Sequence, residues 1–266
     1  MSIDEFTLGI QPPPKRATVW RFMSMSKLMS LLTTESLAFA RIGILNERDP
    51  KEGSYTQQEW ELAKRFENDD RQIDKVLSEL QFLYPHNHYS RSNVIQQYGT
   101  RELERRAQFV RDSFFVNCWN ISKLEPAQLW ASYASEHDGV AIKSTIKRLK
   151  MSVEGDENKI ILGKIRYSYH SDKPSTSDTH LETVYRKRTE FKHENELRLC
   201  VDKSLSIHRD EEFWRSKPAI LIKCDLPMLV SEVRVAPFAG EWAIDAVRNL
   251  LHTYGLDCKV TRSVLA

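Results

Sequence analysis

The second half of the chain is a series of short β-prone segments that no regular crossover helices separate. We expect strands at residues 114–119, 139–143, 159–169, 196–201, 219–224 and 232–235. Parallel neighbouring strands need a crossover connection of about a dozen residues or more, usually a helix. The pattern therefore predicts an α+β fold built on a mixed or largely antiparallel sheet.

The first half of the chain adds two strands and one helix to this sheet. Thr18–Phe22 and Leu37–Arg41 have strand composition, and Ser26 caps a helix between them. Residues 1–17 contain three consecutive prolines, which favour an extended leader. We therefore expect one α+β domain spanning residues 18–266.

Residues from about 54 to 112 differ in character from the rest of the chain. Nine basic and ten acidic residues are interleaved there with apolar side chains. The apolar side chains recur with helical spacing at Ile73, Val76, Leu77 and Leu80. This stretch therefore predicts a helical insertion whose charges form a solvated face.

Composition and missing motifs exclude several protein classes. The chain has 266 residues, a formal net charge of +2 and only nine glycines. It contains neither of the glycine-rich nucleotide-binding motifs G-x-x-x-x-G-K-[ST] and G-x-G-x-x-G. Its four cysteines are far apart, so we expect reduced thiols and no metal site. The acidic start has no apolar region after it, and no apolar run approaches the roughly 18 residues of a membrane span. We therefore expect a cytoplasmic protein without a membrane partner.

The segment around Glu196 is the strongest candidate for chemistry. If a strand runs from Glu194, its period of two places Glu194, Glu196 and Arg198 on one face and apolar residues on the other. Such a row of charges can stabilise positive charge that develops on a sugar carbon, while one carboxylate accepts a hydrogen bond from a ribose hydroxyl. The alternative is an exposed strand face of paired charges without a catalytic role.

Two aromatic groups could accompany this row. Arg21 lies between Trp20 and Phe22, so its guanidinium could hold a phosphate while a ring stacks on a base. Trp130 and Tyr133 share one face of a short helix. Large core side chains explain both groups equally well or better.

The ordered series of these segments resembles the bacterial family known as domain of unknown function 2971. The matching segments are Trp20-Arg21-Phe22, Leu37–Arg41, Asp49-Pro50-x-Glu52-Gly53, Phe115–Trp119, Leu129-Trp130-x-x-Tyr133, Gly139–Ile142, Lys187, His193-Glu194-x-Glu196-x-Arg198, Ala236-Pro237 and Ser263. That family name carries no reaction with it.

The chain is also distantly similar to ADP-ribosyltransferases, which have a split, curved sheet. This similarity implies that Arg21 grips the phosphates or ribose of NAD and that Tyr133 or Tyr185 stacks on the nicotinamide. It implies that Glu196, preferred over Glu194 because Arg198 follows it, stabilises the oxocarbenium-like transition state. Four further residues complete the expected cofactor surroundings: Trp20, Trp130, Lys187 and Arg198. The Ser-Thr-Ser triplet of the arginine-modifying enzymes is absent.

The resemblance thus implies an enzyme that uses NAD to modify nucleic acid or protein, of a toxin or anti-phage defence type. Two alternatives remain open. The first is a non-catalytic nucleic-acid or protein-binding module whose working surface is residues 54–112, which carry Arg91, Arg101, Arg105, Arg106 and Arg111. The second is a nuclease in which Glu194 and Glu196 bind a divalent ion.

Overall fold

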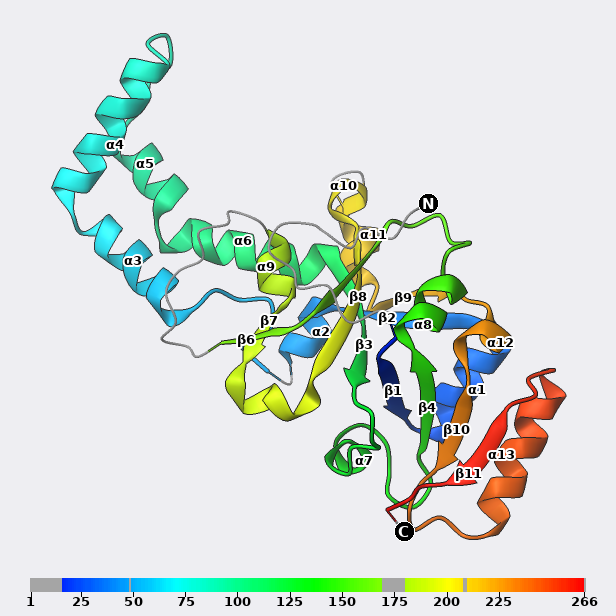
Figure 1. Ribbon diagram of the computed structural model, residues 1–266. Coiled ribbons are helices and arrows are strands. Elements are labelled where there is room, and N and C mark those ends of the chain that lie inside the picture. The colour runs from blue at the N-terminus through cyan, green and yellow to red at the C-terminus, as the bar shows by residue number, and fades with distance from the viewer. Residues whose placement is uncertain (1–15, 48, 169–179, 208–209, 266) are drawn as a thin grey trace.

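A branched nine-stranded sheet forms the centre of the protein. The computed structural model describes residues 16–47, 49–168, 180–207 and 210–265 (Figure 1). The predicted leader lies outside the described residues except for Arg16 and Ala17. The sheet contains β1 (Thr18–Met23), β2 (Ser36–Arg41), β3 (Phe114–Ile121), β4 (Val140–Thr145), β5 (Ile160–Lys164), β8 (Glu196–Asp202), β9 (Ala219–Lys223), β10 (Glu232–Val235) and β11 (Lys259–Arg262). Within this sheet every pairing between described strands is antiparallel except that of β10 with β11, which confirms the predicted α+β class.

Strand β3 is the branch point of the sheet. Strand β8 pairs with nearly the whole length of β3 along one edge of that strand. Strands β1 and β2 therefore both pair with the other edge of β3. On that edge β1 pairs with Asn120 and Ile121, whereas β2 pairs with Phe115 and Val116. Residues 117–119 therefore lie where β1 and β2 diverge, and the sheet is split at this point.

The helices lie around this sheet and in one projecting group. They are α1 (Met25–Thr34), α2 (Ile42–Asn46), α3 (Gln57–Glu67), α4 (Asp70–Leu83), α5 (Arg91–Tyr98), α6 (Thr100–Ser113), α7 (Gln128–Tyr133), α8 (Ile146–Ser152), α9 (His180–Val184), α10 (Ser204–Ile207), α11 (Glu211–Ser216), α12 (Leu226–Leu229) and α13 (Trp242–Thr253). A short parallel pair, β6 (Arg166–Ser168) with β7 (Arg186–Arg188), and the 3-10 helix η1 (Thr189–Glu194) complete the structure.

The main core lies between the sheet and helices α1 and α13. Ser24 caps α1 by accepting a hydrogen bond from the backbone N–H of Lys27, so the prediction of Ser26 as the cap was wrong by two residues. The helix buries Leu28, Leu31 and Leu32. A smaller apolar cluster lies on the other side of β3 and β8, where Tyr185 is one of its members. None of the described helices is long and apolar enough to cross a membrane.

Helices α3 to α6 occupy most of the predicted insertion and form an arm that projects from the sheet (Figure 1). The stripe predicted from Ile73 to Leu80 lies within α4, as expected, and Thr56 and Ser90 each begin a helix with a reciprocal capping box. The arm is attached at its base through Glu59 of α3, whose carboxylate lies 3.1 Å from the Arg186 guanidinium of β7.

Candidate functional site: a buried carboxylate cluster

The segment that carries Glu194 and Glu196 is not one continuous strand. Strand β8 begins at Glu196, and Glu194 ends η1. Asn195 between them adopts a left-handed conformation with φ 38°, which breaks the period of two. Its side chain donates a 2.5 Å hydrogen bond to the Ile121 carbonyl, and Asn120 donates to the Glu194 carbonyl. These bonds to β3 explain why a simple strand pattern was wrong for Glu194.

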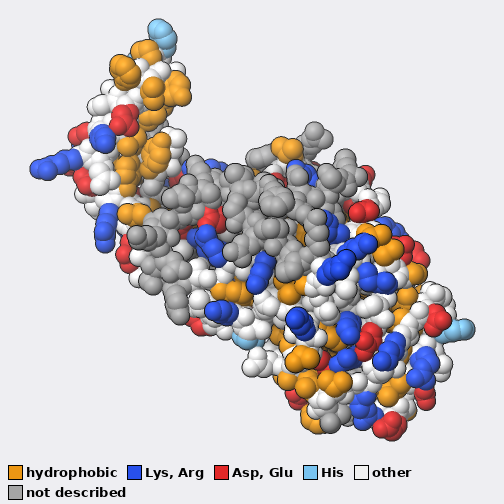
Figure 2. All heavy atoms as spheres, viewed as in Figure 1, with side chains coloured by type: hydrophobic (Ala, Val, Ile, Leu, Met, Phe, Trp, Pro, Cys, Tyr) orange, Lys and Arg blue, Asp and Glu red, His pale blue; other side chains and the backbone are white. Residues whose placement is uncertain are grey.

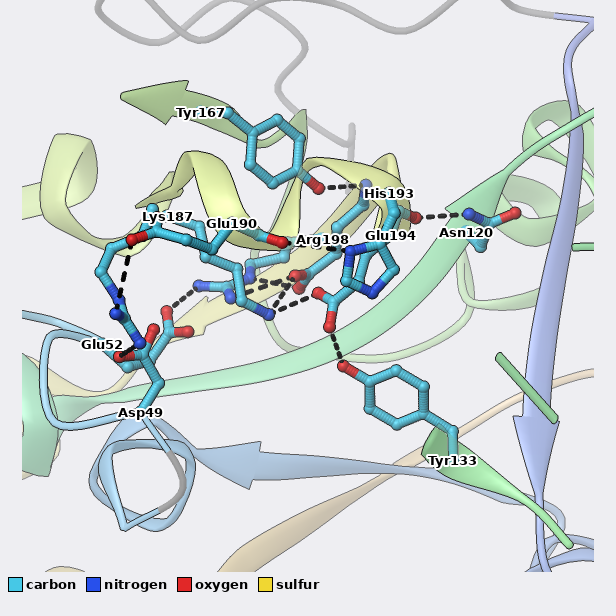
Figure 3. Close-up of polar contacts among 12 residues, drawn as sticks. Asp49, Glu52, Asn120, Tyr133, Tyr167, Lys187, Glu190, His193, Glu194 and Arg198 are labelled. Atoms are coloured by element: carbon cyan, nitrogen blue, oxygen red, sulfur yellow. Dashed lines mark hydrogen bonds and ion pairs between the residues drawn. The ribbon is translucent and has the colours of Figure 1, made fainter. Parts of the chain in front are cut away.

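The side chains of Glu194 and Glu196 nevertheless meet at one ammonium group. Lys187 of β7 donates to Glu194 at 2.5 Å and to Glu196 at 3.1 Å (Figure 3). Arg198 donates to Glu196 from Nε at 2.6 Å and from Nη2 at 3.3 Å. The predicted row of two carboxylates and a guanidinium is therefore present, but it is buried and not an exposed strand face.

A third carboxylate enters the cluster from a distant turn. Glu52 accepts a 2.7 Å hydrogen bond from Arg198 Nη1, which also donates to the Val184 carbonyl at 2.6 Å. Arg198 is 0% exposed and Glu52 is 2% exposed. Sequence reasoning did not assign Glu52 to the site, although it lies in the Asp49-Pro50-x-Glu52-Gly53 motif. Its proximity in space was not visible because 146 residues separate it from Arg198.

The two cations set the protonation state of the deepest carboxylate. Burial by itself would raise the pKa of Glu196, but Arg198 and Lys187 outweigh burial and lower this pKa to about 2. Burial opposes the charge of Lys187 as well, yet Glu196 and Glu52 raise the pKa of that ammonium. The cluster thus contains three carboxylates and two cations, which is a formal charge of −1.

The cluster reaches the surface through Tyr133. The Tyr133 hydroxyl donates a hydrogen bond to Glu194, and this tyrosine is 40% exposed (Figure 3). Burial of the phenol and its bond to Glu194 raise the Tyr133 pKa, so the hydroxyl remains a neutral donor. Glu194 is therefore the carboxylate nearest the open end of the cluster, whereas Glu196 lies behind Lys187.

The split in the sheet holds an arginine without a carboxylate partner. Arg21 donates to the Ala38 carbonyl of β2 at 3.4 Å, and its guanidinium lies 5.9 Å from the centre of the Trp119 ring. Asn117 donates to the same Ala38 carbonyl at 2.7 Å. Burial lowers the pKa of Arg21 to about 10, and no described carboxylate forms an ion pair with it. Its positive charge is thus available to an anion.

Cys118 connects the split to the carboxylate cluster. It lies directly opposite Arg198 in the β3–β8 register, so both side chains emerge on one face. Its thiol interacts electrostatically with Glu196 and with Arg21. Arg21 contacts the Trp119 ring and shares the Ala38 carbonyl with Asn117, and these two side chains alternate with that of Cys118 along β3. Arg21 and Glu196, which the sequence paired, therefore approach residues 117–119 from opposite sides of this strand. Burial raises the pKa of this thiol, which disfavours a thiolate nucleophile.

Three aromatic residues predicted to surround a cofactor lie in the core. Trp20 and Trp130 are each 1% exposed, and their indole N–H groups donate to the Ser122 carbonyl and to Glu125. Tyr185 is 3% exposed and donates to the Ile161 carbonyl at 2.8 Å. Protein atoms cover these rings, which leaves Tyr133 as the exposed aromatic of the predicted set.

A second polar network positions the helix that carries Tyr133. The Glu125 carboxylate accepts hydrogen bonds from Trp130 Nε1 at 2.6 Å, from Arg234 and from Ser263. It thereby joins the start of α7 to β10 and to the C-terminal segment. Ser263 is one of the residues that carry the family resemblance, but its contact with Glu125 crosses 138 residues and could not be read from the sequence.

No protein-family model matches the chain, and no curated protein matches it at a significant level. Nor does the described part of the chain contain a group of three or more His, Cys, Asp or Glu side chains that could hold a metal ion. Between Glu194 and Glu196, the ammonium of Lys187 occupies the position that a shared divalent ion would take.

Proposed function

We propose that the protein is an ADP-ribosyltransferase-like enzyme that binds NAD across the split in its sheet. The observation that carries this proposal is the polarity of the site. Arg21, which has no partner among the described carboxylates, lies where β1 and β2 diverge. The cluster with one excess negative charge includes Glu196 and Arg198 of β8, the strand on the other edge of β3. NAD has the matching polarity, because its pyrophosphate is anionic and its N-ribosylated nicotinamide ring is cationic.

In this proposal Arg21 binds the pyrophosphate, and its planar guanidinium can form two parallel hydrogen bonds to phosphate oxygens. Tyr133, the exposed aromatic at the open end, lies beside the nicotinamide. Glu194 faces the nicotinamide ribose, and Lys187 and Arg198 keep the neighbouring Glu196 ionised behind it.

The reaction breaks the bond between the ribose anomeric carbon and the nicotinamide nitrogen. The bonding electron pair leaves with nicotinamide, and the sugar carbon becomes oxocarbenium-like. The excess negative charge of the cluster stabilises that cation where it develops. A nucleophile of a protein or nucleic-acid acceptor then bonds to the sugar carbon and loses its proton.

The alternatives are less well supported by the contacts. Most arginines expected to bind nucleic acid through the arm are engaged with acids: Arg91 pairs with Asp74 at 3.4 Å, and Arg105 and Arg106 pair with Glu102 at 2.6 and 2.9 Å. For a metal-dependent nuclease, Lys187 would have to leave both carboxylates before a divalent ion could bind.

The proposal is tested by release of nicotinamide from NAD labelled in the nicotinamide ring. We expect release by the wild-type protein, at least about a hundredfold less by Glu194→Gln, and weaker NAD binding by Arg21→Met. Lys164→Met, a change on β5 outside the cluster, is the matched control and should retain activity. Failure of the wild-type protein to bind NAD or to release nicotinamide, with lysate and nucleic acid present as acceptors, would contradict the proposal.

A further inference from the structure

The outer half of helix α4 projects from the arm, and none of the described helices lies beside it. Arg91, the first residue of α5, forms ion pairs with Asp70 and Asp74 in the first turns of α4. Helix α5 therefore begins level with the start of α4 and runs away from its end. The chain returns from Leu83 to Arg91 in non-helical conformation, and α5 covers only the inner half of α4 (Figure 1).

Exposure along α4 follows this difference in cover. Ile73 in the inner half is 1% exposed, and Leu77 and Leu80 are half-buried. At the outer end Phe82, Leu83 and Tyr84 are 85%, 64% and 53% exposed. Figure 2 shows hydrophobic side chains along this arm and near its tip. The apolar seam thus continues past the point where the protein covers it.

The tip also lacks charge, in a chain of which 29% is charged. Residues 80–90 contain no Lys, Arg, Asp or Glu. An anionic membrane surface or a nucleic acid would be bound through basic side chains, which this segment does not offer. A partner for it must present an uncharged apolar seam of similar length.

We propose that the outer half of α4 and the tip, residues 77–84, form an interface with the same segment of a second copy of this chain. An identical segment presents the same apolar side chains, with Glu79 as the one charged residue between positions 77 and 84, and packing two of them about a two-fold axis buries each seam against the other. A helix of this length is only marginally stable alone in water, so such packing also stabilises the projecting turns.

The area of the seam limits the strength of this dimer. The exposed parts of its side chains amount to roughly 500 Å² per copy, given that a large aromatic side chain buries about 150–250 Å². Stable interfaces bury about 800 Å² per partner. We therefore expect a reversible dimer whose population depends on protein concentration.

Sedimentation velocity of the full chain, from low micromolar to several hundred micromolar, tests this inference. We expect the wild-type protein to shift from monomer to dimer, and the double variant Phe82→Glu/Leu83→Glu to dimerise at least roughly a hundredfold more weakly. Both side chains are exposed, so the variant should fold with an unchanged circular dichroism spectrum. Leu205→Glu, at a leucine of α10 whose 79% exposure lies between those of Phe82 and Leu83, is the control and should dimerise like the wild type.

Three results would overturn the inference. The wild-type protein could remain monomeric over the whole range, or the double variant could dimerise as strongly as the wild type. A monomer that binds phosphatidylcholine vesicles through Phe82 and Leu83 would instead assign the tip to a lipid surface. None of these measurements depends on NAD, so their outcome is separate from that of the proposed function.

Discussion

The buried cluster around Arg198 and the helical arm both contain dense networks of ion pairs, but they differ in their access to water. In the cluster Arg198 and Glu52 have side chains that are 0% and 2% exposed. In the arm Arg105 is 69% exposed, although its 2.6 Å contact with Glu102 is as short as those of Arg198. The comparison teaches that contact distance alone does not show how strongly an ion pair matters, because water and salt screen the exposed pair.

Removal of the central cation should have the largest effect. Arg198→Met leaves Glu52 without its cation and Glu196 with Lys187 alone, so we expect the free energy of unfolding to fall by about 3–5 kcal/mol. Urea unfolding followed by circular dichroism measures this loss. The double variant Arg198→Met/Glu52→Gln should lose less unfolding free energy than the sum of the two single changes. It also removes the Glu52 carboxylate charge, which Arg198→Met alone leaves buried without a partner. Strict additivity would contradict the coupling between the two residues.

The pH dependence of stability should show the next largest difference. The pKa of Glu196 is lowered in the folded state, so its contribution to stability is present above about pH 5 and is lost as the pH falls toward about 2. Glu196→Gln should therefore show a shallower loss of unfolding free energy over this range. In the arm, hydrogen bonding to Arg105 lowers the pKa of Glu102 to about 2. Added salt should weaken the pH-dependent contribution of Glu102 to stability, because its partner is exposed, and leave that of Glu196 unchanged. Equal salt sensitivity of the two carboxylates would break the comparison.

Loss of the Tyr133 hydroxyl should have a moderate effect on stability, because this group is less buried than the cluster around Arg198 and less exposed than the ion pairs of the arm. Tyr133→Phe removes the donor to Glu194, and we expect a stability loss of about 1 kcal/mol. If Glu194 faces the ribose as proposed, nicotinamide release should also fall by about tenfold. Tyr254→Phe, at another partly exposed tyrosine, is the control and should change neither quantity. Full activity of Tyr133→Phe would remove Tyr133 from the proposed site.

The smallest effect is expected in the arm. Arg105→Met breaks the contact with Glu102, yet the unfolding free energy should change by less than about 0.5 kcal/mol at physiological salt. Thermal unfolding of Arg105→Met and of the wild-type protein under the same conditions measures this difference in stability. A loss as large as that of Arg198→Met would show that burial does not separate the two networks.

Several features of the fold were accessible from the sequence because they depend on local patterns. The amphipathic stripe from Ile73 to Leu80 and the charge-rich composition predicted helices, and the structure has them. The succession of short β-prone segments predicted the α+β class with a mostly antiparallel sheet. The order of Arg21, Glu194 and Glu196 also indicated which residues to compare in space, although their chemistry remains a proposal.

The sequence could not show which polar residues meet or which rings are covered. Glu52 reaches Arg198, and Glu125 reaches Ser263, only because the sheet brings distant segments together. Trp20, Trp130 and Tyr185 carry polar atoms suited to a ligand, but tertiary packing covers their rings.

By itself, the sequence determined the secondary structure of the arm, the class of the fold and the placement of Glu196 and Arg198 on one face of a strand, because these follow from the spacing of residues along the chain. Only the tertiary structure decided that this pair is buried and that Lys187 and Glu52 join it. It also decided that Arg21 lies where the sheet splits, with no partner among the described carboxylates. Burial and partner choice depend on contacts between residues far apart in sequence. Those contacts, through the local dielectric environment, determine whether a charge is screened, neutralised or available.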